Sequence, residues 1–220
     1  MALEHMLDYL AARKYGYLLF QRLLGTEPSS ELLDAIDADI AADAFALVLG
    51  DDGAECAAPM LDRLRGRDRD TTALAEEYTR LFVGPAALPA PPWESVYVTK
   101  KRIVMQPCTL EVRNAYRAHG FVPVLYPHVP DDHVALELDF LEALASSALD
   151  AYERDNEELY FESIEGSRLF IAEHLGTWVD GFACDMMEKG RSEFYSCTAR
   201  TLAAFVAADA AKLEECGAGA

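Results

Sequence analysis

The side chains that could do chemistry are concentrated in one segment, YPHVPDDHVALELDF, at residues 126–140. Two imidazoles and two adjacent aspartates, His128, Asp131, Asp132 and His133, are groups of the kind that bind a transition metal. Their spacing matches no metal motif with a known mechanism. Aspartate is also a preferred first residue of a helix, where it favours the positive end of the helix dipole. We therefore predict that the two aspartates begin a helix and that no metal site is present.

Catalytic chemistry finds little support in the sequence. The chain contains neither GxSxG nor SxxK, and it has no Walker A or GxGxxG stretch to cradle a phosphate. His133 and Glu137 are four residues apart and would share one face of a helix. One alternative stays open, a small helical nucleotide-binding or hydrolytic enzyme that uses His133 with nearby acids. We predict instead a protein without catalytic residues and without a cofactor.

A proline-rich loop interrupts the helical pattern at LFVGPAALPAPPWESVY, residues 81–97. Four of the ten prolines lie between Pro85 and Pro92, and Pro92 leads directly into Trp93. Proline lacks a backbone donor and fixes φ, so neither a helix nor a central strand can continue through this segment. Such loops are often functional, but proline-rich connections also serve as rigid spacers. Both interpretations stay open, and segment 84–95 is in addition a candidate hinge.

Composition and charge limit the class of partner. The 220-residue chain carries a formal net charge of −19, which disfavours nucleic-acid binding because phosphate recognition needs a basic face. The middle of the chain, residues 71–130, is the exception, with 4 acids and 6 bases. Acidic surroundings beside an apolar loop suit a ligand with a basic end and an apolar body.

The sequence also bears on location and redox state. No apolar run approaches the ~20 residues of a membrane-spanning helix, and the N-terminus lacks the features of a signal peptide. We therefore expect a cytoplasmic protein without an integral membrane segment. The five cysteines form no CxxC pair, which favours reduced thiols. Cys184 and Cys197 are expected in the helical core.

Apolar residues recur at helical spacing along most of the chain. This pattern predicts an all-α fold of about nine or ten helices in a single globular domain, residues 1–220. The second predicted helix begins at Ser29 or Ser30, continues through Leu47 and breaks at 51–53. The stretch 94–106 is expected to be a short helix or an extended connection. The other predicted helices cover approximately 2–24, 54–66, 71–83, 108–119, 131–152, 153–164, 167–188 and 192–214.

Three segments together resemble the cytoplasmic chaperones of complex molybdenum enzymes, the TorD/DmsD/NarJ group, and most of all its TorD/DmsD branch. They are EYTRLFVGP at 77–85, PAPPWESVY at 89–97 and VPDDHVALELDFL at 129–141, in the family's order and separation. The resemblance implies an all-helical, non-enzymatic protein. Its partner would be the twin-arginine signal peptide, and the precursor, of a molybdopterin-containing reductase of the DMSO or TMAO reductase kind. The chaperone would assist cofactor insertion before export.

The resemblance also transfers peptide-binding roles to particular positions. They are Tyr78, Leu81, Phe82, Pro92, Trp93, Glu94, Tyr97, Asp132 and His133. Trp93 would stack on an arginine and Asp132 would accept a guanidinium group. The apolar run of the peptide would lie along Leu81, Phe82 and Pro92. Family members can carry more tryptophan where this chain has Tyr78 and Ala86.

Two further expectations concern nucleotide binding and assembly. GTP binding has been suggested within the family, but the sequence contains no phosphate loop to support it. We expect mainly a monomer, with a minor domain-swapped dimer that exchanges through the proline hinge.

Overall fold

The computed structural model describes residues 3–66, 70–99, 102–123 and 129–217. In this part of the chain every regular element is helical, which confirms the predicted all-α fold, and the eleven α-helices are close to the expected nine or ten. The elements are α1 (Leu3–Gly25), α2 (Ser30–Asp34), α3 (Ala38–Ala54), the 3₁₀ turn η1 (Glu55–Ala57), α4 (Ala58–Arg65), α5 (Thr71–Tyr78), the π-helical turn η2 (Thr79–Val83), α6 (Glu94–Val98), α7 (Pro107–Ala118), α8 (Val134–Glu153), α9 (Glu157–Phe170), the π-helical turn η3 (Ile171–Leu175), α10 (Gly176–Lys189) and α11 (Glu193–Gly217).

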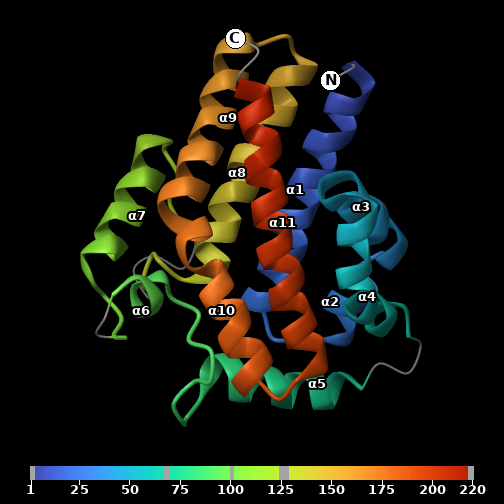
Figure 1. The fold of residues 1–220 in the computed structure, drawn as a ribbon, viewed down its shortest axis with the longest axis vertical. Helices are drawn as coiled ribbons and strands as arrows, with labels where there is room; N and C mark the ends of the chain where they lie inside the picture. The colour runs from blue at the N-terminus through green and yellow to red at the C-terminus, as the bar shows by residue number, and fades with distance from the viewer. Residues whose placement is uncertain (1–2, 67–69, 100–101, 124–128, 218–220) are drawn as a thin grey trace.

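The long helices form a bundle whose axis is vertical in Figure 1. Helix α8 packs against α1 on one side and α9 on the other, and α11 packs against α9 and α10. Helices α3 and α4 flank the bundle on one side, and α6 and α7 flank it on the other (Figure 1). Helix α5 crosses one end, and both chain termini lie at the opposite end.

The core includes a buried ion pair between α1 and α11. Arg13 donates to both carboxylate oxygens of Asp209, at 2.8 and 2.9 Å, and neither side chain is exposed. The hydroxyls of Tyr9 and Tyr17 each donate to the same carboxylate at 2.6 Å. Three side chains thus donate to the buried carboxylate of Asp209, whose burial would otherwise be costly, and they join the two ends of the sequence.

Two predicted helix boundaries are wrong for local reasons. The helix predicted from Ser29 or Ser30 to Leu47 is two helices, because the Asp37 carboxylate accepts hydrogen bonds from the next turn and starts α3. The predicted break at 51–53 falls instead at Gly50, where φ is 74°.

A third boundary is missing altogether. The gap expected between residues 164 and 167 does not exist, because α9 continues through η3 into α10.

The cysteines and the helix surfaces complete this description. All five cysteines are free; Cys197 is buried as expected, but Cys184 is exposed, so its assignment to the core is wrong.

None of the described helices combines the length and hydropathy that crossing a bilayer requires.

Candidate functional site

The proline loop is joined to the start of α8 by the backbone. The amide of Val134 donates to the carbonyl oxygen of Pro92 at 2.9 Å. Trp93 and His133 face each other as one antiparallel bridge, and their rings meet edge to face with centroids 5.5 Å apart. Two motifs about forty residues apart in the sequence therefore form one structural unit.

Asp132 is the residue that holds this unit together. Its carbonyl oxygen accepts from the amide of Glu94 at 3.0 Å, and its Oδ2 accepts from the amide of Ser95 at 2.9 Å. The side chain is fully buried. Since no side chain of its own segment caps α6, Asp132 acts as the cap from another part of the chain.

The helix start predicted at the two aspartates is wrong. Helix α8 begins at Val134, and His133 caps it, because its Nδ1 accepts from the amide of Ala135 at 3.1 Å. Burial lowers the pKa of His133 to about 4, so its imidazole is neutral at pH 7 and can accept this bond. Asp131 instead forms an ion pair with Arg113, with Nη2 and Oδ2 2.6 Å apart.

The structure around the two aspartates also bears on the possibility of a metal site there. Among the residues that the structure describes, no three His, Cys, Asp or Glu side chains are placed to hold a metal ion. His128, which the sequence grouped with the aspartates, lies outside the described residues.

A cluster of buried carboxyl groups lies beneath the loop. Glu94 is 3.2 Å from Nδ1 of His174, and Glu137 accepts from Nε1 of Trp178 at 3.1 Å. Burial, followed by the charge of Glu94, raises the pKa of Glu137 well above its usual range. Glu137 is therefore favoured in its protonated form.

Tyr97 attaches α6 to α10. Its ring stacks on that of Trp178 with centroids 5.5 Å apart, and the guanidinium of Arg102 lies 5.7 Å from the Tyr97 centroid. Arg102 also pairs with Asp185 of α10 at 2.7 Å. These contacts fix the C-terminal end of the loop against the bundle.

The remaining predicted residues form a separate aromatic cluster. Tyr78, Leu81 and Phe82 are each at most 9% exposed. The ring of Phe82 packs 4.9 Å from Tyr78 and 5.3 Å from Tyr195 of α11. In this conformation these side chains support the end of α5 and η2 from inside.

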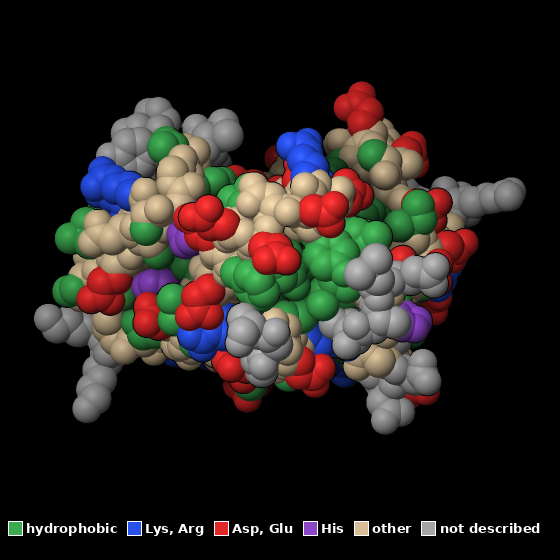
Figure 2. Space-filling model, turned by 90° about the horizontal axis from the view of Figure 1, so that it is seen from above, with side chains coloured by type: hydrophobic (Ala, Val, Ile, Leu, Met, Phe, Trp, Pro, Cys, Tyr) green, Lys and Arg blue, Asp and Glu red, His purple; other side chains and the backbone are tan. Residues whose placement is uncertain are grey.

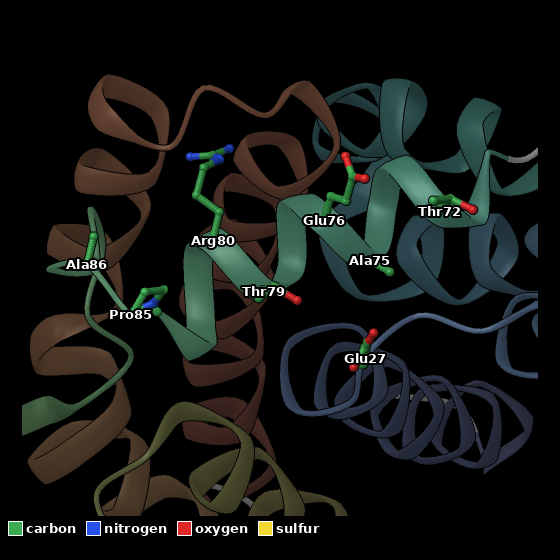
Figure 3. Close-up of a pocket in the computed structure, with 9 residues that line it drawn as sticks. Glu27, Thr72, Ala75, Glu76, Thr79, Arg80, Pro85 and Ala86 are labelled. Carbon is green, nitrogen blue, oxygen red and sulfur yellow. The ribbon is translucent and has the colours of Figure 1, made fainter.

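A pocket of about 460 Å³ lies on the outer side of α5 and η2. Its lining is Glu27, Thr72, Ala75, Glu76, Thr79, Arg80, Gly84, Pro85 and Ala86. Figure 3 shows Glu27 on one side of the helix, Glu76 and Arg80 on the other, and the start of the proline loop at one end. Arg80 donates to the carbonyl oxygen of Arg191 at 3.4 Å, which directs its charge toward the turn before α11.

Gly84 determines where this pocket ends. Its amide closes the π-helical turn by donating to the carbonyl of Thr79 at 2.9 Å. Its φ of 99° lies in the region that favours glycine, so the helix stops here and the loop turns away. The exposed Pro85 and Ala86 then form one wall of the pocket.

The structure thus divides the nine predicted peptide-binding residues into two groups. Six lie on or beside α6: Pro92, Trp93, Glu94, Asp132 and His133 meet where α6 adjoins the start of α8, and Tyr97 packs α6 onto α10. The other three belong to the aromatic cluster behind the pocket. Sequence reasoning missed His174 and Trp178, and it gave Glu137 no role of its own. The sequence could have indicated that Glu137 is buried, because this residue lies on the buried stripe of α8 between Val134 and Leu141.

Comparison with known proteins gives three findings. The sequence profile of the family described as nitrate reductase delta subunit matches residues 45–184. The chaperone protein TorD of Vibrio cholerae is 31% identical over 155 residues, which cover 70% of this chain and 69% of that protein. The Tat proofreading chaperone DmsD of Salmonella typhi is 32% identical over 80 residues, 36% of this chain and 38% of that protein.

A solved structure is similar as well. A crystal structure assigned as a redox enzyme maturation protein from Archaeoglobus fulgidus aligns with a TM-score of 0.52 at 23% identity, over 89% of this chain and 93% of that chain. This similarity supports the fold alone. The relatives named above are chaperones rather than enzymes, as the sequence predicted.

Proposed function

Since the chain belongs to the nitrate reductase delta subunit family, we propose that it is a chaperone for a molybdopterin-containing reductase. In this proposal it binds the twin-arginine signal peptide of the precursor in the cytoplasm. It holds the precursor back from export while the cofactor is inserted.

The observation that carries the proposal is the pocket beside the start of the proline loop. Its lining combines apolar groups with the exposed carboxylates of Glu27 and Glu76. The cation in the same lining, Arg80, is directed to the carbonyl oxygen of Arg191. Carboxylates bind guanidinium groups well, and an apolar wall suits the run that follows the two arginines. Burial, followed by the charge of Glu27, raises the pKa of Tyr78 to about 12, so Glu27 acts on the aromatic cluster behind the pocket.

The junction of α6 and α8 has a second part in the proposal. Trp93 and His133 are half-buried, so part of each residue lies at the surface. Asp132 is fully buried, and its Oδ2 atom already accepts the hydrogen bond of the Ser95 amide. We therefore assign Asp132 to positioning the loop and leave the guanidinium contacts to the exposed carboxylates of the pocket.

Calorimetric titration tests the proposal with a synthetic twin-arginine signal peptide and a twin-lysine control. The double variant Glu27→Gln/Glu76→Gln should weaken binding of the arginine peptide by about 2- to 30-fold, the range for two exposed ion pairs. Glu173→Gln/Glu188→Gln removes two exposed acids elsewhere and is the matched control. Equal binding of the two peptides, or equal effects of the two double variants, would contradict the proposal.

The enzymatic alternative has no observation in its favour. The Nδ1 atom of His133 is already engaged as the cap of α8, and the relatives are named as chaperones.

The expected assembly is mainly a monomer, with a minor domain-swapped dimer. Size-exclusion chromatography with light scattering checks it, and a profile containing only dimer would contradict it.

A further inference from the structure

A second pocket lies at the end of the bundle that is far from the proline loop. It measures about 450 Å³ and lies at the turn between α8 and α9, beside the first turns of α1. Its lining is Leu7, Ala151, Tyr152, Glu153, Asp155, Asn156, Glu157, Tyr160 and Phe161. Figure 1 places this turn at the end that carries both termini, whereas α5 crosses the other end.

The walls of this pocket are aromatic. Tyr152 and Tyr160 lie with ring centroids 5.5 Å apart, and Tyr160 and Phe161 lie 5.2 Å apart. Tyr152 and Phe161 are half-buried, so part of each ring stays open to a ligand. Figure 2 looks onto this end and shows a broad hydrophobic area with acidic side chains around it.

The rim of the pocket is acidic. Glu153, Asp155 and Glu157 are exposed and lie on or beside the turn. Helix α8 ends and α9 begins at this turn, so opposite ends of two helix dipoles meet there and the three carboxylates set the sign of the potential. The nearby Arg154 lines a neighbouring pocket instead, and its Nη2 atom lies 3.9 Å from Oδ2 of Asp150.

We propose that this end pocket is a second peptide site, which binds a lysine or arginine side chain flanked by apolar residues on a partner polypeptide. Aromatic faces attract such cations, and the carboxylates complement their charge. The apolar walls accept the neighbouring residues of the same segment. The two sites lie at opposite ends of a bundle whose helix α11 has 25 residues, or about 37 Å at 1.5 Å per residue, so one peptide side chain cannot reach both.

Nuclear magnetic resonance of the ¹⁵N-labelled full chain tests this site. The probe is a 12-residue synthetic peptide that alternates lysine and leucine, and its control replaces each lysine with glutamate. The lysine peptide should shift the amide signals of Leu7 and of residues 152–161, and added salt should weaken its binding. The glutamate peptide should shift none of them.

Matched variants separate this site from the one beside the proline loop. Glu153→Gln/Glu157→Gln should weaken the lysine peptide by about 2- to 30-fold and leave twin-arginine peptide binding unchanged. Glu27→Gln/Glu76→Gln should leave the affinity for the alternating lysine–leucine peptide unchanged. Phe161→Ala, with thermal unfolding as the check on its fold, should weaken the lysine peptide through the loss of the aromatic wall.

Three results would overturn the inference. One is the absence of shifts at the end pocket, and another is a loss of those shifts in the Glu27→Gln/Glu76→Gln variant. The last is concentration-dependent dimerisation that Glu153→Gln/Glu157→Gln abolishes, which would make a second copy of this chain the occupant. Failure of twin-arginine binding with intact lysine-peptide shifts would count against the proposed function alone.

Discussion

Replacing Asp132 separates two roles that this residue could have. Its Oδ2 atom accepts the amide of Ser95 in a fully buried position, so Asp132→Ala leaves that amide without a partner. A buried donor left unsatisfied costs about 1–3 kcal/mol, which also includes the value of the helix cap. The charge of Asp132 also raises the pKa of the buried Glu137, so removing Asp132 should lower that pKa toward its usual range.

We therefore expect Asp132→Ala to lower the free energy of unfolding by about 2 kcal/mol, or the melting temperature by about 4–8 °C for a chain of this size. Asp132→Asn keeps an oxygen acceptor for the Ser95 amide and should cost about half as much. Urea unfolding followed by circular dichroism measures both values, and titration with the twin-arginine peptide measures binding in the same samples.

The two measurements distinguish positioning from direct contact. If Asp132 positions the loop, peptide affinity falls together with stability, and Asp132→Asn retains the preference for arginine over lysine. An unfolding free energy within about 0.5 kcal/mol of wild type for Asp132→Ala would refute the capping argument, because surface substitutions alone produce changes of that size. Loss of the arginine preference in a fully stable Asp132→Asn variant would make Asp132 a direct ligand.

Further predictions concern the loop, the buried acids and the core. Trp93→Ala should weaken twin-arginine peptide binding by about 2- to 30-fold, the range for one cation–π contact, and leave the helical circular dichroism signal unchanged. Glu137→Gln should flatten the pH dependence of unfolding above about pH 4.5: the raised pKa of Glu137 means that its favourable contribution is complete below its unfolded value and is lost as pH rises. Unfolding titrations at pH 4 and pH 8 check this, and a steeper slope in the variant would contradict it. Arg13→Met should cost about 3–5 kcal/mol in urea unfolding, since it leaves the carboxylate of Asp209 buried without its cation. Arg13→Met/Asp209→Leu should recover part of that loss, because it removes the buried charge but leaves the hydroxyls of Tyr9 and Tyr17 without their acceptor. Equal stability of the single and double variants would count against the ion-pair argument.

Much of the helical pattern could be predicted because it depends on local sequence. The buried stripe Val134, Leu138, Leu141, Ala145 and Ala148 was visible from its spacing alone, and all five residues are buried. The end of η2 at Gly84 followed equally from the glycine and the proline after it. Such signals need no knowledge of the rest of the fold.

The errors at the site arose where a distant segment decides the outcome. Asp132 has the side chain of a helix cap, but it caps α6, almost forty residues away, and leaves α8 to the imidazole of His133. Sequence spacing cannot show which helix an aspartate will cap, because the choice depends on tertiary contacts. The same holds for Glu94, whose burial beside His174 follows from the packing of α6 on α10.

The two interpretations of the proline loop apply to different halves of it. The second half, from Pro92 to Tyr97, is fixed by backbone bonds to α8 and by ring stacking on α10, as a rigid spacer would be. The first half, from Gly84 to Ala86, is a wall of the pocket and has the exposure of a binding loop. Because the second half is anchored, any hinge motion in segment 84–95 must be taken up before Pro92. Movement there would change the pocket directly and leave the junction of α6 and α8 intact. Substitutions should therefore separate the proposed ligand binding at the first half from fold stability at the second half.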